Sequence, residues 1–441
     1  MKARKMKLAA LWLLASSLSA TASVSAQVGA VDPASGTAAA MPASAAVSSF
    51  YNTFNSRPIW FRGPESATAI AQLVSILQRA PFDGFAAGPQ LAQQVQAAIA
   101  QASSGRPDAV AAADRTLSTA WVEYVQAVKR PTPGMDYIYP YLKPQGTRAD
   151  QILMTAAAAP SLARHLAQVS SVNAVYGPLR DAAWAQAQNS GNLTPDPRLL
   201  VNLDRARSIP SAGKFAVVDV GSQRIFMFEN GQPVDSMKVI VGTTEFPTPL
   251  IASTIYYITL NPYWDSPDHL VRRAIAPKTI AGGMKYFNRM GYEVMADWTE
   301  NSAVIPPDQI DWKAVAAGKK QIRVRQKPGP DNFMAKMKIP FPNHNNIYLH
   351  DTPTKALFAK AQRDLSNGCI RLEDASRFAR WLMGGYDPVA SSSQPELQIP
   401  LKQPVPLYVT YLTAQPSGGK VTYTADFYGW DKSAANQVAT R

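Results

Sequence analysis

The spacing of hydrophobic and polar positions changes once along the chain. Up to about residue 210, apolar residues recur at intervals of three and four, as at Ile70, Leu73, Val74 and Leu77. This spacing places them on one face of a helix, and such a stripe is more often packed in a core than used to hold a cofactor. The pattern predicts a helical domain over residues 47–210.

A second pattern begins at Lys214, where β-branched and aromatic residues alternate with polar ones. Alternation of this kind is typical of strands, and Asn230-Gly231 within it favours a hairpin turn. Further strands are predicted at residues 254–260, 346–350 and 405–412. We therefore expect a mainly β domain over residues 211–432, and an α+β fold class for the whole chain.

A segment without a regular pattern, about residues 262–340, interrupts the predicted β domain. It contains short helical pieces, the sequence "KPGPDN" and many aromatic and basic residues. An insertion of this length between strands of one domain is more often a lid or a binding flap than a simple loop. We predict a lid over these residues.

The first residues predict export. Four basic residues within the first seven positions precede an apolar run at residues 8–18 and the small residues "ATASVSA". This is the pattern of a secretory signal peptide, residues 1–26, with cleavage before Gln27. No later stretch reaches the about 20 apolar residues of a spanning helix, so we expect no integral membrane segment in the mature chain. Residues 27–46 are small and almost uncharged, which predicts a flexible tether.

The charge balance points to an anionic partner. The formal charge is +13, and removal of the four basic residues of the signal peptide leaves 13 − 4 = +9. A basic exported protein suits a cell-wall polymer or a membrane surface. Nucleic acid is disfavoured, because export argues against it and no basic cluster is interleaved with aromatics.

Cys369, in "DLSNGCIRLEDA", is the single cysteine of the 441 residues. It cannot form a disulfide within the chain, so it is either an inert buried residue or a reactive thiol. A cysteine nucleophile needs a base and donors for an oxyanion. The backbone amides near Gly368 and Cys369 are candidate donors, and Arg371 is a candidate for lowering the thiol pKa or for binding a substrate carboxylate.

His350 is the candidate base. It ends the predicted strand "NIYLHD", in which alternation points Tyr348 and His350 to the same side. Asp351 follows, and either its carboxylate or its backbone carbonyl is placed to hold the imidazole in one tautomer. From composition and spacing alone, a structural histidine and an inert cysteine remain the commoner interpretation.

The motifs around these residues carry a resemblance to a known family. "YLHDTP", followed by "SNGCIRLED" with the histidine 19 residues before the cysteine, resembles the catalytic signature of the YkuD-type L,D-transpeptidases. The upstream "VGTTEFPTP" is similar to another segment of that family. "FYNTFNSRPIWF", "LQRAPFDGF" and "LLVNLDRARSIP" resemble the N-terminal scaffold of its large periplasmic subgroup, which has a lid over the active site. The resemblance covers most of residues 47–432 and implies a β-sandwich catalytic domain.

The resemblance implies a role for each matching residue. Cys369 would be the nucleophile, His350 the general base and then acid, and the backbone carbonyl of Asp351 the group that orients the imidazole. The candidate substrate-binding residues are Tyr348, Arg371, Ser366, Asn367, Trp264, and the lid residues Asn332 and Lys336. A packed aromatic is the alternative for Trp264, and a solvated lid surface is the alternative for Asn332 and Lys336.

Two features depart from the family pattern. Many members have His or Ser at the position of Asn367. The subgroup often carries a peptidoglycan-binding module between scaffold and catalytic domains, and residues 171–197 contain no recognisable copy. Affinity for the wall would then come from the scaffold, the lid or the basic surface.

The implied reaction is peptidoglycan cross-linking in the periplasm of a Gram-negative-type cell. The thiolate would attack the L-centre carbonyl of meso-diaminopimelate in a tetrapeptide stem and expel D-alanine, and the amine of a second stem would resolve the thioester into a 3-3 cross-link. The resemblance implies no metal or organic cofactor. It does imply that carbapenems acylate the enzyme. Three alternatives stay open: water or a lipoprotein lysine as acceptor, a non-catalytic wall-binding scaffold, and, least favoured, a redox-sensing thiol.

Overall fold

The computed structural model describes residues 42–54, 57–299, 301–388 and 393–438. The predicted signal peptide, residues 1–26, lies outside the described residues, as does most of the predicted tether. The end of the tether was placed wrongly, because helix α1 (Ala43–Thr53) already begins within it. Alanine favours helix, and one face of α1 buries Val47, Phe50 and Tyr51. Within the described part of the chain, no helix is both long and apolar enough to cross a bilayer.

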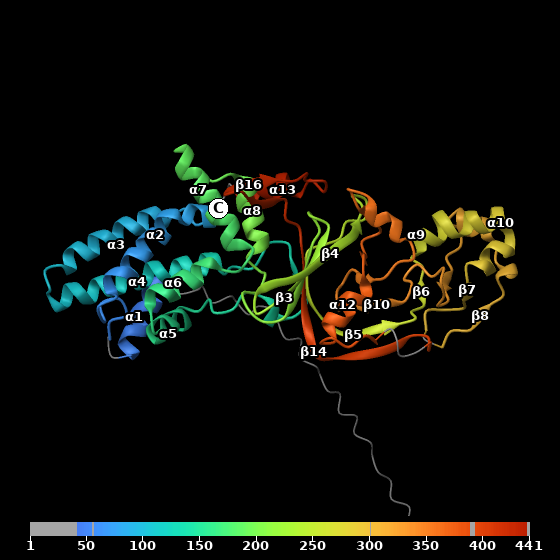
Figure 1. The fold of residues 1–441 in the computed structure, drawn as a ribbon, viewed down its shortest axis with the longest axis horizontal. Coiled ribbons are helices and arrows are strands. Elements are labelled where there is room, and N and C mark those ends of the chain that lie inside the picture. Colours follow the sequence, from blue (N-terminus) through green and yellow to red (C-terminus); the bar gives the residue numbers. More distant parts are fainter. Residues whose placement is uncertain (1–41, 55–56, 300, 389–392, 439–441) are drawn as a thin grey trace, which may run out of the picture. The chain divides into compact units, whose positions relative to one another are not determined.

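Helices make up the N-terminal region, as the three-and-four spacing predicts (Figure 1). Leu73 and Leu77 of the predicted stripe are fully buried, while Ile70 and Val74 pack at the edge of the same core. The helices that follow α1 are α2 (Ser66–Arg79), α3 (Gly88–Ala102), α4 (Pro107–Val128), α5 (Ala149–Ala158), α6 (Leu162–Ser171), α7 (Tyr176–Ser190) and α8 (Pro197–Ala206).

A buried charge network joins these helices. Asp83, at the end of the short helix η1 (Ala80–Asp83), accepts hydrogen bonds from the hydroxyls of Tyr124 on α4 and Tyr176 on α7, each at 3.0 Å. The Arg180 guanidinium of α7 lies 3.0 Å from the same carboxylate, and the two charged side chains are 2% and 0% exposed. A buried ion pair that has further hydrogen-bond partners is costly to break from one side.

One continuous sheet forms the C-terminal region (Figure 1). Its strand order is β1-β5-β10-β11-β13-β4-β3-β2-β14, and β12 pairs with β4. Because β14 pairs with β2 and also with β5, the ladder closes on itself. The strands are β1 (Asp136–Tyr137), β2 (Phe215–Asp219), β3 (Arg224–Glu229), β4 (Gln232–Gly242), β5 (Ile251–Leu260), β10 (Met337–Pro340), β11 (Tyr348–His350), β12 (Asp364–Ser366), β13 (Ile370–Leu372) and β14 (Leu397–Thr410).

The core of this sheet is made of its inward-facing residues together with helix α12 (Ala375–Leu382). Asp374 caps that helix by accepting from the Arg377 amide. The predicted α+β organisation, a helical region followed by a mainly β region, is confirmed. The two layers of the expected sandwich are parts of one closed sheet, since β14 joins them.

The C-terminal segment packs against the last scaffold helices. After β14 come the hairpin β15 (Ala414–Ser417) and β16 (Lys420–Tyr423), and helix α13 (Trp430–Val438). Leu412 and Ala414 share a hydrophobic cluster with residues of α7 and α8. Asp431 forms a buried ion pair with Arg205 and a partly exposed one with Arg198, both on α8 and each at 2.6 Å. The chain therefore fastens the end of its β region to its helical region.

The predicted lid is a small substructure with its own sheet, in the order β6-β9-β7-β8, and its own hydrophobic core (Figure 1). The insertion closes where the Asn261 amide donates to the Lys336 carbonyl at 2.9 Å. The predicted end at residue 340 was wrong, because β10 belongs to the main sheet. The lid elements are β6 (Trp264–Asp265), α9 (Asp268–Leu270), η3 (Val271–Ile275), α10 (Ala276–Arg289), β7 (Tyr292–Met295), β8 (Val304–Ile305), η4 (Pro307–Gln309), α11 (Trp312–Ala316) and β9 (Arg323–Gln326).

Candidate active site

Two neighbouring parallel strands bring the predicted nucleophile and base together. In β11 and β13, Leu349 pairs with Ile370 and His350 with Arg371. Leu349 and Ile370 are fully buried in the core, so alternation turns the residues beside them to the other side of the sheet. Cys369, His350, Tyr348 and Arg371 accordingly line one pocket of about 260 Å³. The side-by-side orientation of Tyr348 and His350 predicted from the sequence is confirmed.

His350 is held as a neutral base. Its side chain is buried, and Nδ1 lies 2.6 Å from the backbone carbonyl of Asp351. A ring that donates from Nδ1 to a carbonyl leaves Nε2 as the acceptor. Burial, together with the positive charge of Arg371, lowers the His350 pKa to about 3. The imidazole is therefore uncharged at neutral pH and ready to take a proton.

The Cys369 thiol is protonated in the resting pocket. Burial raises the pKa of the thiol. Hydrogen bonds from the amide and hydroxyl of Tyr348, and the charges of Arg371 and Lys338, lower the pKa by a smaller amount. Arg371 thus lowers the thiol pKa as predicted, but desolvation outweighs it, so the pKa is raised overall. The Sγ atom lies 3.9 Å from the Asn346 carbonyl, which accepts from a thiol and not from a thiolate.

The loop before the cysteine is fixed by its own hydrogen bonds. The Ser366 hydroxyl donates to the Cys369 carbonyl at 2.6 Å, and the Thr248 hydroxyl donates to the Gly368 carbonyl at 2.7 Å. Gly368 has φ +102°, a backbone conformation that strains any residue with a side chain, and a Cβ there would also push on Cδ1 of Ile347 at 2.9 Å. Ser366 lies at the pocket wall as predicted, but its hydroxyl proton is used to shape the loop and not to meet a substrate.

The "VGTTEFPTP" segment has a structural purpose in this site. Thr248 accepts from the Gly242 amide at 2.9 Å while it donates to Gly368, so it joins β4 to the cysteine loop. The Tyr428 hydroxyl donates to the Gly242 carbonyl at 2.6 Å and accepts from the Thr248 amide at 3.1 Å. A residue of the C-terminal segment therefore braces the loop that carries the thiol.

A comparison with protein families agrees with this geometry. Residues 213–390 match the family described as the YkuD L,D-transpeptidase catalytic domain, and residues 45–182 match the family described as the Scaffold domain. The chain carries an N-terminal Scaffold domain followed by a YkuD L,D-transpeptidase catalytic domain. Cys369, His350 and the Thr248 brace all lie within the matched transpeptidase domain.

Three individual proteins that match this chain are 30% identical to it or less. A Haemophilus influenzae protein named "Putative L,D-transpeptidase" is 30% identical over 241 residues, which are 53% of this chain and 48% of that protein. The match therefore spans about half of that relative's length. Among solved structures, the Ldtfm-avibactam carbamoyl enzyme shares 11% identity (TM-score 0.22, 44% of this chain and 48% of that one). An L,D-transpeptidase from Mycobacterium smegmatis shares 14% (TM-score 0.21, 46% and 60%). Values this low carry no argument.

The lid forms the remaining wall of the transpeptidase pocket. Trp264 lines it, as predicted, and Asn367 lies at its edge. Asn332 does not reach it: the side chain is 1% exposed, and its amide donates to the carbonyls of Pro262 and Lys327, each at 3.0 Å. Asn332 holds the base of the lid together, so the predicted contact with substrate was wrong. The lid residues that line the pocket are Trp264, Pro267, Leu270, Ala274, Ile275, Lys278, Tyr286, Tyr292 and Phe333.

Lys336 and the Asp351 carboxylate also lie outside the transpeptidase pocket. The Lys336 amide donates to an Asp351 carboxylate oxygen at 3.4 Å, and the Lys336 side chain is exposed. The other Asp351 oxygen pairs with the Lys355 ammonium at 2.6 Å. Of the two options for Asp351, the backbone carbonyl is therefore the group that orients His350. Lys336 does not line the pocket, and its contact with substrate stays a prediction.

Two lid residues at the site were missed in the sequence. The His269 ring stacks on the Phe246 ring, with 4.8 Å between the two ring centres. Its Nε2 lies 3.3 Å from Oδ1 of Asn367, beside the cysteine loop. Lys278 of α10 contributes a second cation to a pocket that already contains Arg371. None of the described residues that line this pocket is Asp or Glu. The insertion has no regular pattern, so no sequence signal shows which of its residues fold back over the thiol.

Proposed function

We propose that this protein is a peptidoglycan L,D-transpeptidase that forms 3-3 cross-links through a cysteine thioester. The observation that carries the proposal is the pairing of a neutral His350, with Nε2 as acceptor, and a protonated Cys369 in one pocket of the YkuD domain. Such a pair supplies a nucleophile and its base without charge separation in the resting state.

The first half of the proposed reaction forms the acyl-enzyme. His350 Nε2 takes the thiol proton as Sγ bonds to the L-centre carbonyl of the donor stem, and the carbonyl oxygen becomes an oxyanion. The amides of Gly368 and Cys369 are the proposed oxyanion donors. The oxyanion then collapses, and the same proton passes from Nε2 to the leaving D-alanine amine. Tyr348 and Arg371 stabilise the negative charge on sulfur at the start of this step.

The second half transfers the acyl group. The side-chain amine of an acceptor stem loses a proton to His350 as its nitrogen bonds to the thioester carbon, and the departing sulfur takes that proton back. Water competes with this amine. The pocket wall formed by Trp264, Leu270 and Phe333 favours the stem, because an apolar lid keeps bulk water from the thioester. This wall favours cross-linking over hydrolysis.

Incubation with purified disaccharide-tetrapeptide, followed by mass spectrometry, tests the proposal. We expect a dimer that has lost one D-alanine. A tripeptide monomer alone would assign an L,D-carboxypeptidase, and unchanged substrate would leave a wall-binding scaffold. Export to the periplasm is part of the proposal, and N-terminal sequencing of protein recovered from that compartment, with Gln27 or a near neighbour first, tests it.

Lys278 is expected to recognise a carboxylate of the donor stem. Two cations, Lys278 and Arg371, line a pocket without acidic residues, and an ion pair at an exposed lysine contributes up to about 1 kcal/mol. We expect Lys278→Gln to lower kcat/KM for the tetrapeptide donor by up to about fivefold. For a donor with an amidated C-terminus, the same substitution should lower kcat/KM much less. Lys285→Gln removes an exposed lysine of α10 outside the pocket, and should leave kcat/KM unchanged for both donors.

The pH dependence of thiol alkylation should report the raised pKa of Cys369. A thiolate reacts with iodoacetamide and a thiol does not, so the rate should rise about tenfold per pH unit through neutrality and level off only above the ordinary cysteine pKa. Since Arg371 lowers this pKa, Arg371→Ala should move the midpoint further up, while Arg371→Lys should move it less. A midpoint below the ordinary value would contradict the burial argument.

A further inference from the structure

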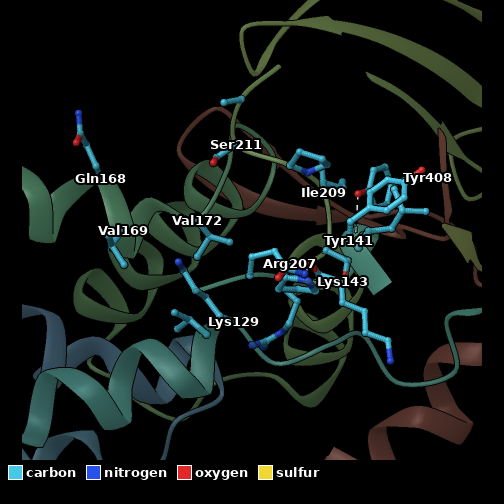
Figure 2. A pocket seen from close by; sticks show the side chains of 17 residues that line it. Lys129, Tyr141, Lys143, Gln168, Val169, Val172, Arg207, Ile209, Ser211 and Tyr408 are labelled. Carbon is cyan, nitrogen blue, oxygen red and sulfur yellow. Dashed lines mark hydrogen bonds between the residues drawn. The ribbon is translucent and has the colours of Figure 1, made fainter. Parts of the chain in front are cut away.

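A cavity of about 490 Å³ lies away from the catalytic pocket and is larger than it. It forms where the end of α4 and helix α6 meet residues 141–145 and residues 207–212 (Figure 2). Lys129, Val169 and Val172 lie on one side of it, and Tyr141, Lys143 and Tyr408 on the other. None of these residues has a role in the transpeptidase reaction proposed above.

The charge of this cavity is one-sided. Three cations line it, Lys129, Lys143 and Arg207, and none of its described lining residues is acidic. The Arg207 side chain is 1% exposed and caps α4 by donating to the Ala127 carbonyl at 2.7 Å. Asp204 pairs with Arg207 Nη2 at 2.5 Å, but Nε is buried with no hydrogen-bond partner in the described structure. An orphaned buried donor beside a cavity is a position that a ligand oxygen or a water would satisfy.

Lys129 adds a second observation. Its ammonium is partly buried, burial lowers its pKa, and no carboxylate among the described residues offsets that effect. A desolvated cation without a counter-ion is stabilised when an anion binds beside it. The Lys143 ammonium lies elsewhere on the lining, 6.0 Å from the centre of the Tyr137 ring. The cavity therefore has cations at more than one position.

The rest of the lining is apolar or aromatic. Val128, Val169, Val172 and Ile209 line the cavity with the rings of Tyr141 and Tyr408. Pockets of this volume usually bind molecules with an apolar body and a few polar groups that set the orientation. A free phosphate would leave most of this lining in contact with water. An elongated peptide with carboxylates spaced along it would use both the cations and the apolar surface.

We propose that this cavity is a second, non-catalytic binding site for an acidic peptide stem of the wall polymer. Stem carboxylates would lie at Lys129 and Arg207, and the methyl and methylene groups would lie against the valines and tyrosines. The proposal goes beyond the catalytic role of Cys369, and takes from it only the choice of ligand. It would supply wall affinity in a chain whose residues 171–197 contain no recognisable wall-binding module.

The experiment uses full-length protein with Cys369→Ala, so that nothing reacts, and titrates soluble disaccharide-tripeptide by calorimetry. We expect Lys129→Gln in this background to weaken binding at one class of site about tenfold. Lys402→Gln removes an exposed lysine of β14 with the same change in charge and should have no effect. Arg371→Ala should weaken only binding at the catalytic pocket. Ile209→Trp, which fills the cavity without changing charge, should also weaken the second site.

Several outcomes would overturn the proposal. These are equal binding by the Lys129→Gln and Lys402→Gln proteins, a single class of site that Arg371→Ala removes, or no effect of Ile209→Trp in a protein with an unchanged melting temperature. The cross-linking assay is independent of this result. Lys129→Gln should leave turnover of a soluble donor unchanged, so failure of the catalytic proposal and failure of this one can be told apart.

Discussion

Replacement of Cys369 with alanine is expected to abolish both thioester formation and cross-linking, by at least about four orders of magnitude in rate. The proposed mechanism passes every acyl group through Sγ, and Cys369 is the single cysteine of the chain. Intact-protein mass spectrometry after incubation with disaccharide-tetrapeptide should show an acyl adduct on the wild type and none on the variant. The dimer that lacks one D-alanine should disappear in parallel.

The fold of this variant should be retained, which makes the loss of activity interpretable. The Cys369 backbone carbonyl, and not its sulfur, accepts the bond from Ser366, and Gly368 stays bound to Thr248. We therefore expect the melting temperature of Cys369→Ala to change little. Cross-linking that survives in a folded variant would refute the thioester mechanism. Wall-related activity in cells that survives without cross-linking would support the non-catalytic scaffold.

The sequence was sufficient to find the candidate pair, Cys369 and His350, because the signals that mark it are local motifs and alternation within one strand. Alternation in β11 decides that Tyr348 and His350 share a side, whatever strand lies next to them. The position of Cys369 beside them depends on parallel pairing between β11 and β13, which was not predicted; the motif resemblance implied only that the two residues act together. The net rise of the thiol pKa was not predicted, because a sequence shows the nearby arginine but not the burial that outweighs it.

The lid was the least predictable part. An asparagine looks the same in sequence whether it meets a substrate or bonds to neighbouring carbonyls, and Asn332 does the second. Lys278 and His269 reach the site because the lid folds as a unit with its own core. The closure of the sheet could not be predicted either. Alternation predicts that β14 is a strand, but it does not show that β14 pairs with both β2 and β5.

The second large effect is expected far from the thiol, at Asp83. Asp83→Ala should lower the free energy of unfolding by about 3–5 kcal/mol, because the Arg180 guanidinium would lose its buried counter-charge and keep only the exposed Asp181. The Tyr124 and Tyr176 hydroxyls would lose their acceptor at the same time, and an unmade buried hydrogen bond adds to the cost. Denaturant unfolding of wild type and variant measures this difference.

Arg180 offers a matched control, because it also pairs with Asp181 at 2.8 Å, and that carboxylate is 57% exposed. Asp181→Asn should change the free energy of unfolding by about 1 kcal/mol or less, since water replaces an exposed partner. In the double variant Asp83→Ala with Arg180→Met, the buried charge is gone, and part of the lost stability should return. Equal effects of Asp83→Ala and Asp181→Asn would show that burial does not set the strength of this network, and that the scaffold depends instead on its apolar core.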